Sequence, residues 1–528
     1  MYSLVTGRSL AGHAAIIAGA FAVSRVLGML REVVIAARFG TGETLDAYNA
    51  AFRIPDLLFV IVMSGAFGSA FIPVFGGFLA RGDEERAWRL ANALLTWTVV
   101  ILLLVAQLIL VFAEPLVAGL IAPELSPAAR DLAVDLTRLL LLSPLLLGLG
   151  AAAKGMLEAQ DMFTLPAVAP IVYNVGIILG ALLLSPSLGI HGLVAGVIAG
   201  AAGHAGIQFA WLLRHGLAIR PTLSLRVEGL REVARLVGPR LAGQFVSQSN
   251  LIVMTNFASR AGDGAISALS YGQQLVMLPH GILALSLSTV IFPRMVRQFE
   301  LGELGGVRQT LLQALRPLIF LTIPAAVMFF TLRQSIVQVV LQYGNFTAES
   351  TTMVVDTIAW FALGLLARSI IEPLTRTFYA MHDTRTPLLV STLAVVLNVG
   401  LSWFLLDRMG LAGLALSLSL SSIVRMLVLL GLLARRTPHL IGGLARPVAR
   451  MVPATLVLLV LGWAIGGPVA RVTDPAEGGR LWGYPLFIFA VMALGAAYVV
   501  TARLCRVPEV TAVLAKVRTR VGRGTPSA

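Results

Sequence analysis

Apolar stretches of about 20 residues recur along almost the whole chain, and they limit what it can fold into more than any other feature. An α-helix rises 1.5 Å per residue, so about 20 residues cross a hydrocarbon core roughly 30 Å thick. We predict about fourteen membrane-spanning helices, over residues 13–38, 45–79, 90–113, 132–157, 164–184, 190–213, 232–258, 265–293, 309–332, 351–381, 387–406, 411–433, 447–468 and 482–504. The predicted fold class is therefore all-α integral membrane.

The composition supports this prediction and excludes several classes of protein. Of the 528 residues, 57% are apolar and only 12% are charged, whereas soluble domains carry roughly 25% charged residues. Such a chain is neither a soluble globular protein nor a disordered one. Its single cysteine, Cys505, cannot form an intramolecular disulfide or a thiolate metal cluster.

The distribution of basic residues predicts the orientation. Lys and Arg collect on the cytoplasmic side of membrane proteins, and they alternate between loops here in a way that places both termini in the cytoplasm. The first span begins shortly after Arg8 and lacks a cleavage site, so we expect it to be retained. With a net charge of +14, the chain suits an anionic membrane surface better than nucleic acid.

An internal repeat predicts two similar halves. The segment Phe71–Asp83 realigns with Ile291–Glu303 at a shift of about 220 residues, and Gly189–Leu193 realigns with Gly410–Leu414 at nearly the same shift. Each copy holds six spans, an even number, so the halves enter the membrane in the same sense, as in parallel-repeat transporters. The predicted domains are an N-terminal six-helix lobe (1–220), a C-terminal six-helix lobe (221–440), and two additional helices with a basic cytoplasmic tail (441–528).

Charged residues inside the predicted spans are the main functional signal. A charge in the bilayer costs at least about 2.5 to 3.5 kcal/mol on insertion scales, so such residues pair, line a wet cavity or snorkel to an interface. The carboxylates are Glu32, Asp56 and Glu372. The arginines are more numerous and comprise Arg25, Arg31, Arg53, Arg138, Arg240, Arg368 and Arg425.

This excess of positive charge favours an anionic ligand. Arg25 lies halfway along its span, which predicts a cavity residue or, alternatively, a structural ion pair. Glu32 follows seven positions later on the same helix face and is a possible ion partner for Arg25. The planar guanidinium group, with five donors, matches phosphate oxygens well.

Motifs for chemistry are absent from the sequence. It contains no GxxxxGK[ST] phosphate loop, no HExxH and no pair of CxxC motifs, and we predict neither an enzyme nor a cofactor or metal site. The predicted outer loops are short, which disfavours an external catalytic domain. Gly192, Gly196 and Gly200 recur every fourth residue, a pattern typical of closely packed membrane helices.

Several segments resemble the MurJ/MviN family of lipid II flippases. In the N-terminal half they are Ser24–Glu32 (SRVLGMLRE), Phe39–Tyr48 (FGTGETLDAY), Ala51–Leu58 (AFRIPDLL) and Gly65–Phe75 (GAFGSAFIPVF). In the C-terminal half they are Leu278–Pro293 (LPHGILALSLSTVIFP), Leu341–Thr347 (LQYGNFT) and Arg376–Pro387 (RTFYAMHDTRTP). The resemblance implies the multidrug/oligosaccharidyl-lipid/polysaccharide exporter fold. It further implies transport of the undecaprenyl-diphosphate-linked peptidoglycan precursor from the inner to the outer leaflet of the bacterial plasma membrane.

The resemblance also implies site residues. Arg25 and Arg31 match two cavity arginines of the family, Asp46 matches its acidic residue after the first helix, and Arg53 matches a basic position. Within the C-terminal lobe, Arg240 or Arg368 could supply a further cation. The predicted substrate-binding set is therefore Arg25, Arg31, Glu32, Asp46, Arg53, Arg240 and Arg368.

Other positions depart from the family pattern. Phe59 stands where an arginine is expected, Gln273 and Gln274 replace an Asp-Arg pair, and Ser64 replaces a glutamate. These departures keep two alternatives open. One is an exporter of another polyprenyl-linked glycan or of a drug cation, and the other is a membrane scaffold that does not transport.

Overall fold

The computed structural model describes residues 10–65, 71–476 and 480–510, and within these ranges it contains helices and connecting turns. The chain forms two compact units. The first comprises Met1–Ser267 with the short segment Tyr343–Phe346, and the second comprises Ala268–Gln342 with Thr347–Ala528.

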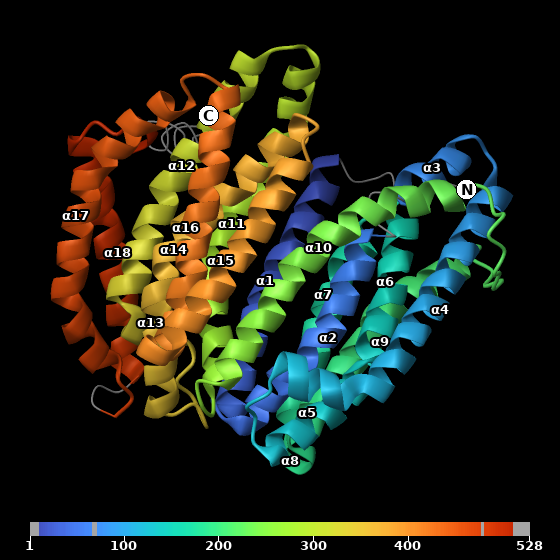
Figure 1. Cartoon of the computed structure of the whole chain (residues 1–528), viewed down its shortest axis with the longest axis horizontal. Coiled ribbons are helices and arrows are strands. Elements are labelled where there is room, and N and C mark those ends of the chain that lie inside the picture. Colours follow the sequence, from blue (N-terminus) through green and yellow to red (C-terminus); the bar gives the residue numbers. More distant parts are fainter. Residues whose placement is uncertain (1–9, 66–70, 477–479, 511–528) are drawn as a thin grey trace, which may run out of the picture. The chain divides into compact units, whose positions relative to one another are not determined.

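The first unit is a helical bundle (Figure 1). Its core lies where the aromatic rings of α3 meet α4 and α6: Phe71, Phe75 and Phe78 are buried, and Phe71 stacks on Phe75 at 4.8 Å between ring centroids. The elements are α1 (Leu10–Phe39), α2 (Glu43–Gly65), α3 (Phe71–Ala80), α4 (Glu84–Leu116), η1 (Val117–Ile121), α5 (Pro127–Leu140), α6 (Leu142–Glu158), α7 (Thr164–Leu179), η2 (Gly180–Leu184), α8 (Ser185–Leu188), α9 (Ile190–Arg214) and α10 (Leu230–Ser259).

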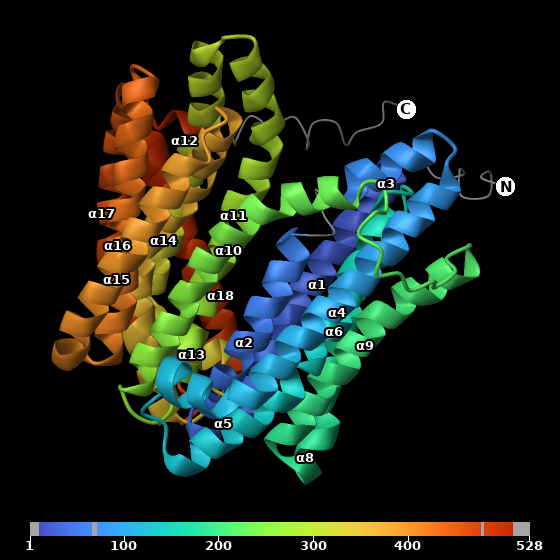
Figure 2. The same cartoon turned by 45° about the vertical axis from the view of Figure 1, so that its right-hand side comes forward.

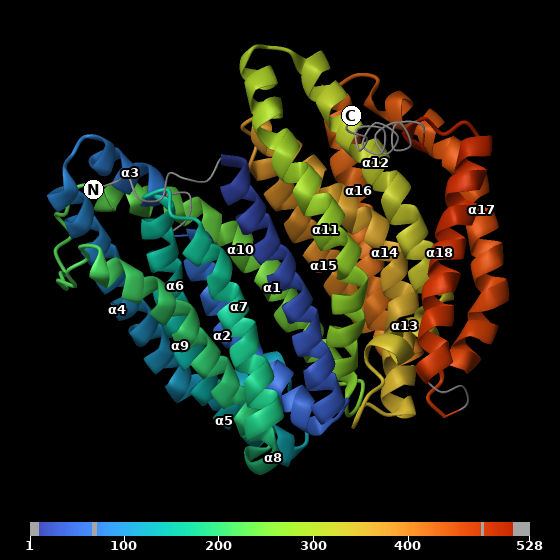
Figure 3. The same cartoon turned by 180° about the vertical axis from the view of Figure 1, so that it is seen from behind.

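The second unit is also helical, and α17 and α18 pack side by side within it (Figure 3). They join its core rather than forming a separate one, since Phe320 of α12 lies 5.2 Å from the ring of Tyr498 on α18. The elements are α11 (Ala265–Glu300), whose first residues belong to the first unit, α12 (Leu304–Thr331), α13 (Arg333–Val340), α14 (Ala348–Ala380), α15 (Arg385–Met409), α16 (Leu411–Arg436), α17 (Leu440–Thr473) and α18 (Arg480–Leu504).

Eleven spans in the described part of the chain are long and apolar enough to cross a membrane. They coincide with eleven of the predicted spans, and the all-α membrane fold is confirmed. The other three predicted spans fall on α1, on α2 together with α3, and on α10; residues 66–70 of the second of these spans lie outside the described residues. Helices α1, α2 and α10 each carry several charged residues. The total of fourteen spans stays a prediction.

Glycines bring α7 and its continuation η2 into backbone contact with α9. A Cβ atom at Gly196 would lie 2.7 Å from the Cα atom of Gly180, and one at Gly200 would lie 2.6 Å from the carbonyl oxygen of Tyr173. A Cβ atom at Gly192 would lie 2.5 Å from the carbonyl carbon of Leu184. Real Cβ atoms do not approach so closely, so the packing function predicted for this glycine series is confirmed.

We expect Gly196→Leu to separate α7 from α9 and to lower the free energy of unfolding by about 1–3 kcal/mol, the usual range for overpacking. Thermal unfolding in detergent measures this. Gly206→Leu, on the same helix, is the matched control, because a Cβ atom there meets nothing within 4 Å. If both variants lose the same free energy of unfolding, the close contact of Gly196 does not stabilise the protein.

Asp383 anchors the turn between α14 and α15 in the second unit. Its carboxylate accepts hydrogen bonds from the backbone N–H and the hydroxyl of Thr386, at 2.9 and 2.7 Å, and it pairs with Arg436 of α16 at 2.7 Å. Burial acts to raise the pKa of Asp383, but the hydrogen bonds from Thr386 and the charge of Arg436 outweigh burial and hold the pKa below its usual value. The ionised form of Asp383 therefore stabilises the folded state.

We expect Asp383→Asn to lower the free energy of unfolding by about 1 kcal/mol at pH 7, a modest value because Arg436 is half-exposed. Since the folded pKa lies below the unfolded value of about 3.9, this stabilisation is complete above that value and is lost as the pH falls through the folded pKa. Thermal unfolding of the unmodified protein and of Asp383→Asn at pH 7 and at about pH 3 tests this dependence. If the two proteins differ in stability by the same amount at both pH values, the ionised carboxylate is not the cause of the difference.

Candidate functional site

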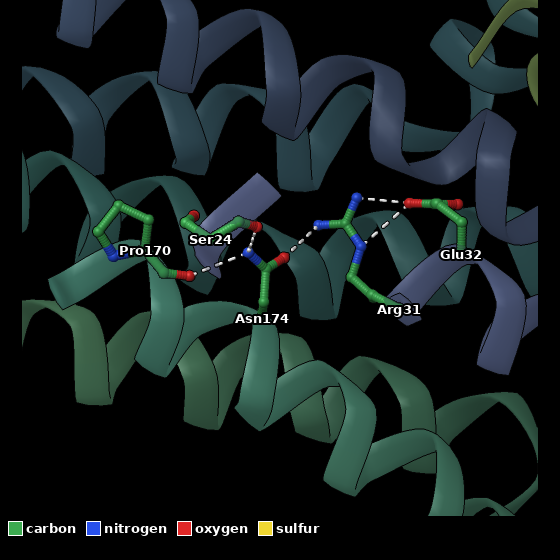
Figure 4. A network of polar contacts seen from close by, with 5 residues as sticks. All are labelled: Ser24, Arg31, Glu32, Pro170 and Asn174. Atoms are coloured by element: carbon green, nitrogen blue, oxygen red, sulfur yellow. Dashed lines mark hydrogen bonds and ion pairs between the residues drawn. The ribbon is translucent and has the colours of Figure 1, made fainter. Parts of the chain in front are cut away.

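Arg31 is the centre of a polar network between α1 and α7 (Figure 4). Its Nε atom donates to Oε1 of Glu32 at 3.0 Å, its Nη2 atom contacts the same oxygen, and its Nη1 atom donates to Oδ1 of Asn174 at 3.2 Å. The amide nitrogen of Asn174 donates in turn to the carbonyl oxygens of Pro170, at 3.0 Å, and Ser24, at 3.4 Å. Asn174 thereby fixes the orientation of the guanidinium group.

This arrangement leaves part of the guanidinium group available. An arginine has five N–H donors, and within the described residues three of those of Arg31 are used by Glu32 and Asn174. The side chain of Arg31 is 26% exposed and that of Glu32 is 18% exposed. The guanidinium group of Arg31 is fixed by Glu32 and Asn174 and is partly accessible, so its two remaining N–H donors can bind an anion.

Glu32 pairs with its neighbour Arg31 and not with Arg25 as its spacing indicated, so that interpretation was wrong. Residues seven apart share a helix face, but they are separated by about 10.5 Å along the axis. Arg31 can fold back onto the adjacent carboxylate without bridging that distance. The side chain of Arg25 is exposed.

Two charged residues of α2, Arg53 and Asp56, contact α10, and both helices belong to the first unit (Figure 2). Arg53 donates from Nε to the hydroxyl of Thr255 at 2.7 Å. Oδ2 of Asp56 accepts a hydrogen bond from the amide of Gln248 at 3.1 Å. These two contacts connect the charged part of α2 to one face of α10.

Asp46 has a capping role in the structure. Its side chain is buried, and Oδ1 accepts a hydrogen bond from the backbone N–H of Ser267 at 2.7 Å and another from the Ser267 hydroxyl. Ser267 is in the first turn of α11, where backbone N–H groups lack partners within the helix. Asp46 supplies the acceptor that an N-cap residue would otherwise provide, and its negative charge suits the helix N-terminus.

The segment Tyr343–Phe346 packs against the end of α1. Asn345 donates from its backbone N–H to the carbonyl of Ala37 and from its amide to the carbonyl of Arg38, both at 2.7 Å. Gly40 has a φ of +65°, and a Cβ atom there would lie 2.5 Å from the carbonyl oxygen of Asn345. Two of the segments that carry the family resemblance, FGTGETLDAY and LQYGNFT, thus contact each other.

Of the predicted site residues in the C-terminal lobe, the structure locates one. Arg368 of α14 contacts the sulfur of Met277 at 3.3 Å, and Met277 lies one turn after Gln273 on α11. The side chain of Arg240 lies outside the described residues. Groups of three or more His, Cys, Asp or Glu that could hold a metal ion do not occur among the residues searched, which are the described ones.

Comparison with known proteins identifies the family. The family described as "Lipid II flippase MurJ" matches residues 35–469. The chain belongs to this family.

Individual relatives agree with the family match. The "Probable lipid II flippase MurJ" of Buchnera aphidicola subsp. Acyrthosiphon pisum is 30% identical over 448 residues, which cover 83% of this chain and 87% of the relative. The "Lipid II flippase MurJ" of Burkholderia cenocepacia is 30% identical over 454 residues, covering 84% and 87%. Membership and the eleven apolar spans identify a multi-pass membrane protein.

Solved structures show the same fold. A structure described as "Lipid II flippase MurJ, inward closed conformation" has a TM-score of 0.76 at 24% identity and covers 93% of this chain and 98% of its own. A multidrug resistance MATE family transporter of the MOP superfamily in an inward-facing conformation has a TM-score of 0.65 at 14% identity, covering 81% and 98%. The exporter fold implied by the resemblance to the MurJ family is confirmed.

Sequence reasoning missed the uncharged partners Asn174, Gln248 and Thr255. The available signal was weak: each is a polar residue within a predicted span, where polar groups tend to face other protein groups. That signal does not indicate which charged residue each one contacts.

We expect Asn174→Ala to leave the Nη1 atom of Arg31 without its acceptor and to lower the free energy of unfolding by about 1–3 kcal/mol. The control is Gln160→Ala, which removes only a hydrogen bond to the nearby carbonyl of Met156. Thermal unfolding in detergent compares the two variants. A loss no larger in Asn174→Ala than in the control would show that the network does not stabilise the first unit.

Proposed function

We propose that this protein moves lipid II, the undecaprenyl-diphosphate-linked peptidoglycan precursor, from the inner to the outer leaflet of the bacterial plasma membrane by alternating access. The observation that carries the proposal is the match to the lipid II flippase MurJ family over residues 35–469. The protein is then a transporter and not an enzyme. The alternating distribution of Lys and Arg supports cytoplasmic termini.

The geometry around Arg31 supports an anionic head group as the substrate. Its two remaining N–H donors can bind phosphate oxygens, and Glu32 with Asn174 holds the planar group in one orientation before the substrate arrives. Arg25 lies six residues earlier, about 9 Å along the helix axis. Its exposed side chain adds positive charge to the same helix.

A cationic substrate is less well supported, because the carboxylates that would attract a cation already have partners. Glu32 binds Arg31, Asp46 binds Ser267, and Glu372 binds Arg376 at 3.0 Å. Within the described residues, these acidic groups stabilise the helices that carry them. A drug cation would have to displace an arginine, a capped helix end or, at Asp56, the amide of Gln248.

Arg31→Ala tests the proposal. We expect transport of lipid II in reconstituted vesicles to fall by about 10- to 100-fold, since one or two charge-assisted hydrogen bonds are lost. Arg31→Lys should recover only part of the activity, because an ammonium group keeps the charge but lacks the planar fork.

Arg89→Ala is the matched control for that experiment. Arg89 forms an exposed ion pair with Glu85 on α4 and contacts neither Arg31 nor its partners in the described structure. Unimpaired outward movement of lipid II in Arg31→Ala, with the control also active, would refute a role for this arginine. Absence of lipid II transport by the unmodified protein would refute the proposed function itself.

A further inference from the structure

A cavity of about 290 Å³ lies inside the first unit, between α1, α2, α6, α7 and α9. Its walls are largely apolar and include the rings of Phe21, Phe59 and Phe163. Apolar cavities of about 150 Å³ already accept small apolar molecules. This cavity is large enough for a segment of a hydrocarbon chain.

A charged pair on α6 lines the same cavity. Nζ of Lys154 lies 3.7 Å from Oε1 of Glu158, and the two side chains are 40% and 25% exposed. Hydrogen-bonded ion pairs have N···O distances of about 2.7–2.9 Å. Lys154 and Glu158 therefore attract each other, but both retain hydrogen-bonding capacity for a ligand.

The residues that line the cavity do not include Arg31, Glu32 or Asn174, although two helices, α1 and α7, border both sites. Pro170 of α7 lines the cavity, and its carbonyl oxygen accepts the hydrogen bond from Asn174. Phe59 contributes an aromatic ring to the wall, at a position where the resemblance to the family predicts an arginine. An apolar ligand thus has more wall contact here than the family pattern implies.

We propose that this cavity is a binding site for a zwitterionic phospholipid with a primary ammonium head group, such as phosphatidylethanolamine. One acyl chain occupies the apolar cavity, the phosphate contacts Lys154, and the ammonium group contacts Glu158. This site goes beyond the proposed flippase activity, because the lipid is a bound component of the first unit and not the cargo.

Charge complementarity selects this head group. An anionic lipid would pair with Lys154 but would place a second negative charge beside Glu158. A lipophilic cation would pair with Glu158 but would place a second positive charge beside Lys154. A quaternary choline group carries charge without an N–H donor, so it cannot donate a hydrogen bond to Glu158. A zwitterion with a primary ammonium group satisfies both members of the pair.

The test is native mass spectrometry of the full-length protein in detergent micelles that contain equal amounts of phosphatidylethanolamine, phosphatidylglycerol and phosphatidylcholine, each with a distinct isotopic label. We expect phosphatidylethanolamine to be retained about tenfold more than either other lipid, the effect of one charge-assisted hydrogen bond. Excess lipid II should not displace it. This measurement on the unmodified protein does not depend on its transport activity.

Variants locate the bound lipid. Lys154→Met and Glu158→Gln should each remove the selectivity for phosphatidylethanolamine, and Ala151→Phe, which fills the cavity, should abolish retention. Arg89→Met is the control, because it removes one member of an i,i+4 ion pair on α4 that does not line the cavity.

Preference for phosphatidylglycerol, equal retention of the three lipids, displacement by lipid II, or selectivity that survives in folded Lys154→Met would each overturn the proposal.

Discussion

The cost of an unpaired polar group in hydrocarbon governs this structure. Backbone N–H and C=O groups inside a bilayer need partners within the protein, which is why the described chain is helical throughout its spans. The same requirement applies to side chains: Arg31 is held by Glu32 and Asn174, and Arg53 donates to Thr255. Asp46 meets the same requirement at a helix end, because it accepts a hydrogen bond from a backbone N–H group in the first turn of α11. These charged residues of the first unit thus lie where a counter-ion or a hydrogen-bonding group of the protein can reach them.

Helix α7 connects two kinds of contact that depend on each other. Gly176, with Gly180 at its C-terminal end, allows backbone contact with α9, while Asn174 presents its amide to α1. A side chain at either glycine would move α7, and with it the acceptor for Arg31. Pro170 adds a third function, because it lines the cavity and accepts the hydrogen bond from Asn174. The glycines on one face of α7 therefore allow the close helix contact that positions the amide of Asn174 on another face.

Much of the fold could be predicted from the sequence, because hydropathy over 20 residues is a local property. The glycine series in α9 was also interpreted correctly, since its fourfold spacing places all three residues on one face. The partners of the charged residues were harder to predict. The possible pair of Arg25 with Glu32 was inferred from the shared helix face alone, whereas the short distance between neighbouring side chains favours the pair of Arg31 with Glu32. Asn174 lies 143 residues from Arg31, and no local pattern relates the two.

The pairing of Arg31 with Glu32 has a consequence for substrate binding. A diphosphate group that uses the two remaining donors of Arg31 would approach a carboxylate already bound to the same guanidinium group. At about 4 Å, two like charges repel by about 4 kcal/mol at an effective dielectric constant of 20. This repulsion opposes the attraction between the substrate and Arg31. Under the proposed function, Glu32 therefore has two opposing effects: it orients Arg31, and its charge limits how strongly an anionic head group binds beside it.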